Sequence, residues 1–540
     1  MYHPPSDTGA YAPINFSAIE RQLASRFVKE GFLGLADLPD PSTFKDMDRA
    51  TKRIVQAIHG GEKIILIGDY DVDGVVSTTL MKLFFEEIGV ELEWIIPNRF
   101  RDGYGLSPTL ISRIQEYDLA ITVDNGIASV EAAELCKVHQ VDLIITDHHL
   151  LPERLPDAYA IINQKQTDCN FPYEEVCGAQ IAWYLIASLN RTLATGIDTR
   201  NYLTLVAIAI IADMMPLQHI NRTMVIAGLK GLSKARYPAI KSFLERLDRV
   251  TLSAEDIAFQ IAPVLNSAGR MDDAKWAVAF LLSRNVHDAR VRLDRLVGFN
   301  EERKRIEQEI TKKAMAMVNP ADAVIVVAGQ GWHEGVVGIV AARLARHYEK
   351  PTIVLTEGEN GELKGSGRSF HACNLFKITQ ASRSLLSKFG GHHAAIGLSL
   401  PALNLVPFTT ALQENYRAQN YPLNPFDPDI LGCLRFVEVT PSLIAMMKQY
   451  EPYGQGNPRP KFISRGIRID EVTVMGKEKE HRRFSLHQDG VVLTAVLFKT
   501  TERFEVGGMV DLIYTLHENH FNHRITIQLM IEKITPTFTL

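Results

Sequence analysis

A short apolar run that leads directly into three alternating aspartates places the strongest constraint on this chain. The run over residues 64–67 predicts a buried strand, because all four of its residues are apolar. Asp69, Asp71 and Asp73 follow it, and Gly74 permits a tight turn into the next helix. Carboxylates this close repel one another, and hard divalent cations prefer oxygen ligands. The stretch alone is consistent with either a metal site or a solvated acidic loop.

Apolar strands alternate with helical patterns from residue 63 to about residue 165. Strands are predicted over residues 64–67, 92–96, 119–123, 142–146 and 158–162, and helices over 75–88, 107–117 and 129–139. This alternation is typical of a doubly wound α/β domain with a mostly parallel sheet. Ligands of such sheets bind at the carboxyl ends of the strands. Two more predicted strands end in polar groups there, at Asp124 and at Asp147-His-His149.

The residue types at these strand ends favour a particular kind of metal. Asp213 adds a further carboxylate, just past the end of an apolar helical stretch. A mixed set of aspartate and histidine ligands favours Mn²⁺ or Mg²⁺ over zinc held by thiolates. Several carboxylates with one histidine can hold two ions that share a bridging aspartate. Such a pair of ions suits in-line attack on phosphorus.

The composition limits which partners and which cellular compartment can be expected. A net charge of -5 over 540 residues provides no global basic field, so any polyanion has to bind in a local cleft. The five cysteines form no C-x-x-C pair, which fits a protein of the reducing cytoplasm. No signal peptide is evident, and the longest apolar run, over residues 203–212, is too short to cross a bilayer. We therefore expect a cytoplasmic protein with no membrane partner.

The patterns divide the chain into a series of segments. They are a helical lead-in (1–60), a first α/β domain with a mostly helical second half (61–290), a long connecting helix (291–317), a smaller α/β domain (318–415), a linker or crossing segment (416–450) and an OB-type β-barrel (451–540). In the smaller domain, a Gly-rich loop over residues 390–393 is predicted to lead into a strand over 394–400. In the barrel, separate strands are predicted over 462–470 and 471–475.

Several motifs in combination resemble the DHH phosphoesterase superfamily. They are Gly68-Asp-Tyr-Asp-Val-Asp-Gly74, Val123-Asp-Asn-Gly126, Asp147-His-His149 and Ala212-Asp213. Gly390-Gly-His392 resembles the signature of the DHH-associated domain, and Tyr453-Gly-Gln-Gly-Asn-Pro458 is similar to the segment that leads into the OB-fold of the RecJ family. With the stretches 98–105 and 265–270, the chain is identified as a member of the RecJ family from about residue 45 to its end.

The resemblance gives these segments roles. It makes residues 61–290 the DHH phosphoesterase domain, 318–415 the DHH-associated domain and 451–540 an OB-fold-like nucleic-acid-binding domain. It implies metal ligands at Asp71, Asp73, Asp124, His148 and Asp213. Asp124 is expected to bridge two ions, and Asp69 is either a ligand or a carboxylate that supports one. Asp147 is expected to orient His148, and His149 to contact the scissile phosphate as an acid.

Substrate contacts are expected on several loops and strands. Arg99 can grip a phosphate and Tyr104 can stack on a base, although an ordinary loop arginine and a packed tyrosine are the alternatives. Ser366-Gly367-Arg368 is expected to hold a terminal 5′-phosphate. Gly390, Gly391 and His392 are expected to approach a phosphate through the backbone, and Asn266 and Arg270 to face the nucleic acid or support the metal site. Trp332 and His333 either line the same groove or pack in the core.

The C-terminal strands carry interleaved basic, acidic and aromatic side chains. The basic residues are Arg465, Arg468, Lys477, Lys479, Arg482 and Arg483, with Phe484 and Phe498 nearby. Such a surface suits a single-strand groove. A solvated β surface over an aromatic core is the alternative.

The resemblance implies an exonuclease that degrades single-stranded DNA from its 5′ end. It would release 5′-mononucleotides with two Mn²⁺ or Mg²⁺ ions, in repair and recombination. A single-strand-binding protein and a RecQ-type helicase are the implied partners. Two alternatives remain: a phosphodiesterase for short oligoribonucleotides or cyclic dinucleotides, and a catalytically inactive scaffold.

Overall fold

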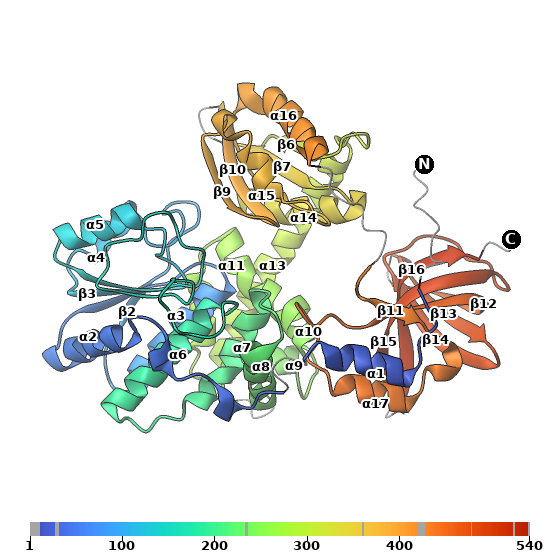
Figure 1. Cartoon of the computed structure of the whole chain (residues 1–540), viewed down its shortest axis with the longest axis horizontal. Coiled ribbons are helices and arrows are strands. Elements are labelled where there is room, and N and C mark those ends of the chain that lie inside the picture. The colour runs from blue at the N-terminus through green and yellow to red at the C-terminus, as the bar shows by residue number, and fades with distance from the viewer. Residues whose placement is uncertain are drawn as a thin grey trace.

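The computed structural model describes residues 11–27, 32–232, 236–358, 361–419, 427–476, 478–521 and 524–537. Figure 1 shows an α/β body with a helical half, a smaller sheet domain above it and a red C-terminal barrel beside it. The long helix α13 (Val286–Met315) runs from the helical half to the smaller domain. This arrangement confirms the expected fold class. In the described part of the chain, no helix has both the length and the apolar character needed to span a membrane.

The first sheet has five parallel strands in the order β2-β1-β3-β4-β5. They are β1 (Ile64–Ile67), β2 (Glu93–Ile95), β3 (Leu119–Val123), β4 (Asp142–Thr146) and β5 (Ala160–Ile162). Ile64 and Leu66 belong to the core on one face, and Ile65 and Ile67 to the core on the other. Because both faces of the sheet are covered, the sequences of its central strands are continuous apolar runs. The carboxyl ends of β1, β3 and β4 meet at one edge.

The helices of this domain depart from the prediction in two places. Helix α3 (Val72–Glu87) begins three residues earlier than expected, because the Asp71 side chain caps it. The helix predicted over residues 107–117 is shorter than expected and begins as a 3-10 turn. Only a 3-10 turn (Pro108–Leu110) and the single turn α4 (Ile111–Ile114) form there. The apolar spacing that suggested a longer helix serves instead to bury this short segment against the sheet.

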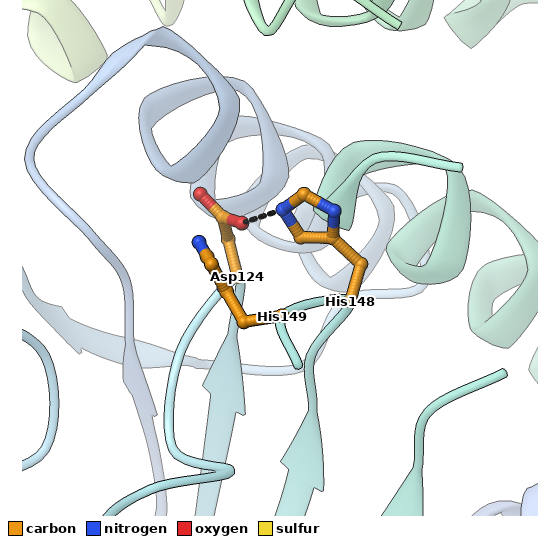
Figure 2. A group of neighbouring side chains, drawn as sticks. All are labelled: Asp124, His148 and His149. Atoms are coloured by element: carbon orange, nitrogen blue, oxygen red, sulfur yellow. Dashed lines mark ion pairs between the residues drawn. The ribbon is translucent and has the colours of Figure 1, made fainter. Parts of the chain in front are cut away.

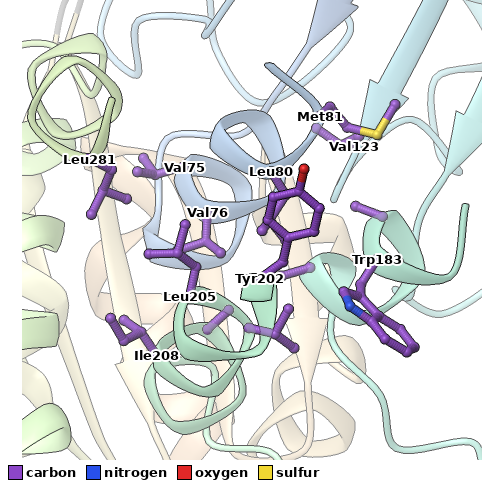
Figure 3. Close-up of a cluster of buried hydrophobic side chains, with 14 of the residues drawn as sticks. Val75, Val76, Leu80, Met81, Val123, Trp183, Tyr202, Leu205, Ile208 and Leu281 are labelled. Carbon is purple, nitrogen blue, oxygen red and sulfur yellow. The ribbon is translucent and has the colours of Figure 1, made fainter. Parts of the chain in front are cut away.

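The helical half forms the largest core of the molecule around α3, α6 (Gly178–Leu193) and α7 (Leu203–Ala212). Every residue of α7 from Leu203 to Ile210 is buried, as expected for a helix that is apolar all round. Figure 3 shows Leu205 and Ile208 beside Val75 and Val76 of α3. This packing fixes both the start of α3 and the end of α7, where candidate ligands lie.

The smaller domain has a mixed sheet in the order β6-β7-β8-β10-β9. Its strands are β6 (Ile325–Gly329), β7 (Thr352–Glu357), β8 (Glu362–Arg368), β9 (Lys388–His392) and β10 (Ala395–Pro401), with helix α14 (Glu334–Tyr348) after β6. The Gly-rich loop predicted over residues 390–393 is wrong, because residues 388–392 form the edge strand β9. Gly391 has φ +133, and a Cβ there would lie 2.3 Å from the oxygen of Ala395, so glycine permits this pairing.

The C-terminal domain is a closed barrel in which β12 pairs with both β13 and β15. Its strands are β12 (Lys461–Met475), β13 (His481–Gln488), β14 (Val491–Phe498), β15 (Met509–Phe521) and β16 (Arg524–Pro536). The two strands predicted over residues 462–475 are one long bulged strand, β12. The segment expected as a linker over 416–450 contains β11 (Ile430–Cys433), which pairs with β12, and helix α17 (Pro441–Lys448).

The N-terminal lead-in belongs to two cores. Helix α1 (Phe16–Ser25) buries Ile19 and Leu23 in the core of the barrel domain, and Figure 1 shows this blue helix beside α17. Helix α2 (Met47–Gly60) packs instead on the first α/β domain. The two ends of the described chain therefore meet at the barrel.

Candidate metal centre and substrate cleft

Three aspartates leave β1 for α3 at the edge of the sheet. Oδ1 of Asp71 accepts hydrogen bonds from the amides of Asp73 (2.9 Å) and Gly74 (3.2 Å), which turns the chain into the helix. Gly74 is required by close approach, because a Cβ there would lie 2.5 Å from the backbone oxygen of Asp69. Asp69 and Asp73 are buried, whereas Asp71 is half-buried. The tight turn therefore brings all three carboxylates to the strand ends.

Asp73 is held by the N-terminus of α6. Its two carboxylate oxygens accept hydrogen bonds from the amides of Gly178 (2.6 Å) and Ala179 (2.8 Å). The first turn of a helix stabilises negative charge through its free amides and its dipole. Burial still outweighs these bonds and raises the pKa of Asp73 above its ordinary value.

Asp124 and His148 face each other from the ends of β3 and β4 (Figure 2). Asp124 Oδ1 lies 3.1 Å from His148 Nε2, in ion-pair range but without a hydrogen bond. The same Nε2 lies 3.7 Å from carboxylate oxygens of Asp73 and Asp213. Asp213 reaches the site from the C-terminus of α7. One imidazole thus stands among three carboxylates from three different elements.

Three overlapping groups of side chains each have ligand atoms within 4.8 Å of one another. They are Asp124 with His148 and His149, Asp73 with His148 and Asp213, and Asp69 with Asp71 and Asp124. The predicted ligands are therefore brought together. Asp124 joins two of the groups, which is the placement expected of a bridging ligand.

The electrostatics of this cluster favour a cation. Burial, reinforced by neighbouring carboxylates, raises the pKa of Asp69, Asp124 and Asp213 well above the ordinary range. Each of these carboxyls has a buried oxygen without a hydrogen-bond partner among the described residues. Burial lowers the pKa of His148 to about 4, which leaves the neutral imidazole that metals bind. The donor set of carboxylates and one neutral imidazole fits Mn²⁺ or Mg²⁺.

Asp147 contacts a different histidine from the one expected. Its Oδ1 accepts hydrogen bonds from Nδ1 (2.7 Å) and the amide (3.0 Å) of His149, and its Oδ2 accepts one from the amide of Ile127. The expectation that Asp147 orients His148 is wrong, because the turn after β4 directs its carboxylate to the next residue. Burial alone would raise the pKa of Asp147, but these bonds outweigh it and the pKa is lowered. Burial alone would lower the pKa of His149, but Asp147 raises it to about 9.

A pocket of about 420 Å³ lies between the first domain and the smaller domain, and Tyr70, which stands between Asp69 and Asp71 in the sequence, is part of its wall. Five of the predicted substrate residues line it, namely Arg99, Tyr104, Arg270, Ser366 and Arg368. Arg368 Nη1 donates to the Ser366 hydroxyl (2.6 Å) and to the oxygen of Gly367 (2.8 Å). Burial and the charges of Arg99 and Arg368 lower the pKa of Arg270 to about 10. Arginines gathered this closely indicate a site for an anion.

The other predicted substrate residues lie in different surroundings, and Tyr104 of the pocket also contacts His149. Asn266 Oδ1 accepts a hydrogen bond from the amide of Val72 (3.2 Å), so it supports the turn that carries the aspartates. Tyr104 is 49% exposed, and its hydroxyl lies 3.3 Å from His149 Nε2. Gly390, Gly391 and His392 are exposed on the edge strand β9. Partial burial lowers the pKa of His392, and the charges of His149 and Arg368 lower it further, so this edge lies near the cleft.

Two other expectations concern aromatic and basic residues. Trp332 is a buried core residue, packed against Gly329, whereas His333 caps α14 and contacts Phe100 across the domain boundary. In the barrel, Arg482 is buried and donates to backbone oxygens, so it is structural. Lys477 lies outside the described residues.

Sequence reasoning missed two residues that hold the histidine pair. Asn163 Nδ2 donates to the oxygen of His149 (3.0 Å), and Lys165 Nζ donates to the oxygen of His148 (2.5 Å). Both follow β5 at the same sheet edge. The rule that ligands bind at strand ends would have indicated them, because the carboxyl end of β5 lies at the predicted residue, Ile162.

Replacing Gly74 with alanine is expected to destabilise the first domain by about 2 kcal/mol, because the added Cβ meets the Asp69 backbone. Gly298→Ala is the matched control, since a Cβ there meets nothing within 4 Å on α13. Thermal unfolding of both variants measures the difference. Equal unfolding temperatures would mean that the turn tolerates a side chain.

Comparisons with known proteins cover each domain. The sequence matches the DHH family N-terminal domain over residues 63–210, the DHHA1 domain over 321–417 and the RecJ OB domain over 432–533. The chain is 33% identical over 527 residues to the single-stranded-DNA-specific exonuclease RecJ of Salmonella typhimurium, covering 91% of this chain and 90% of that protein. It is 34% identical over 517 residues to the protein of the same name from Bacillus subtilis, covering 92% of this chain and 64% of that longer relative.

Solved structures show the same architecture. RecJ of Thermus thermophilus in complex with Mn²⁺ aligns with a TM-score of 0.81 at 23% identity, over 98% of this chain and 80% of that chain. A crystal structure of exonuclease RecJ bound to manganese aligns with a TM-score of 0.61 at 27% identity, over 71% of this chain and 96% of that chain. With three matched domains and 33% identity to a RecJ protein along nearly its whole length, the chain belongs to the RecJ family of DHH proteins.

Proposed function

We propose that this protein is a metal-dependent 5′→3′ exonuclease for single-stranded DNA that releases 5′-mononucleotides. The observation that carries the proposal is the meeting of the carboxylate cluster with the arginine-lined pocket. The cluster fits divalent cations, and Arg99, Arg270 and Arg368 fit the phosphates of a strand end. Relatives that align with 91–92% of this chain are named single-stranded-DNA-specific exonucleases.

The residues proposed to hold the ions are the members of the three ligand groups other than His149, which is proposed as an acid. They are Asp69, Asp71, Asp73, Asp124, His148 and Asp213. Divalent ions bound there would activate the attacking water and neutralise charge on the phosphodiester. Mn²⁺ and Mg²⁺ are both compatible with the donor set, and two overlapping groups that share Asp124 support two ions.

The chain's own groups would supply position and a proton. Water adds to the phosphorus of the second nucleotide, the bond to the 3′ oxygen of the first breaks, and that oxygen takes a proton. His149 is the proposed acid, because Asp147 raises its pKa to about 9 and keeps it protonated at neutral pH. Arg368 and Ser366 would bind the terminal 5′-phosphate. Tyr104, beside His149, would stack on a base.

The alternative of a phosphodiesterase for short substrates shares the same metal cluster. It leaves the barrel domain without a purpose, whereas the exonuclease uses it as a surface for the rest of the strand. A single strand, the matching duplex and a dinucleotide, each incubated with Mn²⁺, separate these functions. Hydrolysis of the long single strand in preference to the other two supports the exonuclease. Hydrolysis of the dinucleotide alone would replace it with the short-substrate enzyme.

Lys165 is proposed to position His148 through its bond to the backbone oxygen. Lys165→Met keeps most of the aliphatic stem but removes this hydrogen bond, so we expect kcat to fall about tenfold with little change in KM. Lys137→Met, at a largely exposed ion pair, is the control and should behave as wild type. An unchanged kcat for Lys165→Met would show that the backbone of the turn alone holds the histidine.

The cellular setting follows from the proposed reaction. The substrate is single-stranded DNA with a free 5′ end, as repair and recombination produce. A single-strand-binding protein and a RecQ-type helicase are proposed partners, since each supplies or marks such strands. The five cysteines form no disulfide in the described part of the chain, which suits the reducing cytoplasm.

A further inference from the structure

The candidate ligand Asp213 stands apart from the others in how it is held. It follows the last residue of α7, where the helix dipole disfavours a negative charge. Its Oδ2 has no hydrogen-bond partner within the described part of the chain. Met214, the next residue, has a left-handed backbone with φ +57. On its N-terminal side Asp213 is held by α7, because its amide donates to the oxygen of Ala209 (2.9 Å). On its C-terminal side it is held by the loop over residues 214–218, which leads to α8 (His219–Leu232).

That loop is docked on a turn of the C-terminal domain. The amide of Leu217 donates to the oxygen of Gln455 (2.7 Å), and Nε2 of Gln218 donates to the oxygen of Gly456 (2.7 Å). Both bonds cross between residues more than two hundred positions apart in the sequence. The partner turn, over residues 453–458, is the segment that leads into the barrel.

Two glycines let the turn approach this closely. A Cβ at Gly454 would lie 2.8 Å from Leu217 Cδ1. At Gly456, which has φ +71, a Cβ would lie 2.9 Å from Cβ and 3.2 Å from Cα of Pro216. The first clash involves the end of a flexible side chain, but the second involves a rigid ring next to the backbone. Gly456 is therefore the position at which contact with the loop is most sensitive.

The turn is itself firmly anchored. Asn457 is fully buried, and its Nδ2 donates to the oxygens of Tyr450 (2.8 Å) and Pro452 (2.9 Å). Arg26 donates to Asn457 Oδ1 (2.9 Å), so the N-terminal segment holds the turn from the other side. From α8, Arg222 donates to the oxygen of Glu451 (2.7 Å). An anchored turn can fix the loop that rests on it.

We infer that the turn over residues 453–458 positions the metal ligand Asp213, so that the barrel domain helps to build the metal centre. This inference rests on the proposed metal site. This role is additional to any role of the barrel in holding DNA. Only three residues of backbone separate Asp213 from Leu217, whose amide contacts the turn. The turn is a positioning element and touches no substrate.

The test compares two glycine variants of the full chain. Gly456→Ala adds a methyl group against Pro216, and Gly490→Ala, with φ +83 in the same domain, meets nothing within 4 Å. Both carry the same kind of backbone strain. We expect Mn²⁺ affinity, measured by calorimetry, to fall about tenfold in Gly456→Ala and to stay at the wild-type value in Gly490→Ala. Turnover of a 5′-phosphorylated dinucleotide should likewise fall in Gly456→Ala and stay at the wild-type value in Gly490→Ala.

Other outcomes are equally decisive. If wild type binds Mn²⁺ and both glycine variants match it, the inference is wrong and the proposed function is unaffected. If wild type binds no Mn²⁺, the proposed function itself fails. Should Gly456→Ala not fold, Gln218→Ala removes one bond to the turn and should weaken Mn²⁺ binding several-fold. A barrel that only holds DNA would instead raise KM for long strands and leave Mn²⁺ binding unchanged.

Discussion

Asp124→Asn is expected to lower the rate of cleavage by about a thousandfold or more. Asp124 belongs to two of the three candidate ligand groups, so its replacement weakens the binding of both proposed ions. A loss of about 4 kcal/mol in stabilisation of the transition state corresponds to that factor. Asparagine suits this position because Asp124 has φ 62, a left-handed conformation that asparagine tolerates.

The stability of Asp124→Asn should change in the opposite direction to its activity. Removing one charge from a buried set of carboxylates relieves repulsion, so the metal-free variant should unfold at a temperature no lower than wild type. Added Mn²⁺ should raise the unfolding temperature of wild type more than that of the variant. A variant that kept a tenth of the wild-type rate would show that Asp124 is not a shared ligand.

Arg368→Ala is expected to abolish the preference for a 5′-phosphate. The charged hydrogen bonds of one guanidinium to a phosphate contribute about 2 kcal/mol, so kcat/KM on a phosphorylated strand should fall about 30-fold. The rate on a strand with a 5′-hydroxyl should change little. Arg305→Ala removes an exposed arginine of α13 that pairs with Glu302, and it should leave both rates unchanged. Equal losses on both strands would assign Arg368 to another step.

The sheet and its aspartates could be predicted because local sequence determines them. Four apolar residues in β1 specify a covered strand, and the parallel topology then brings Asp69, Asp124 and His148 to one edge. The spacing of motifs was therefore enough to assemble most of the candidate cluster. The roles of these residues in catalysis remain a prediction that the experiments above test.

Contacts between distant segments could not be predicted in the same way. The partner of Asp147 is set by the geometry of the turn after β4, and the edge strand β9 is set by pairing with β10. The docking of the loop after Asp213 on the turn at Gln455 joins segments with no shared pattern. Such features depend on tertiary packing, which periodicity and motif spacing do not describe.

The most direct test of the account follows a long single strand labelled at its 3′ end, with Mn²⁺ present. The account predicts labelled products that shorten step by step from the 5′ end, with 5′-mononucleotides released. The matching duplex should remain intact, and Asp124→Asn should show no shortening. Internal cuts, release of the 3′ label as the first product, or no cleavage by wild type would contradict the proposed exonuclease.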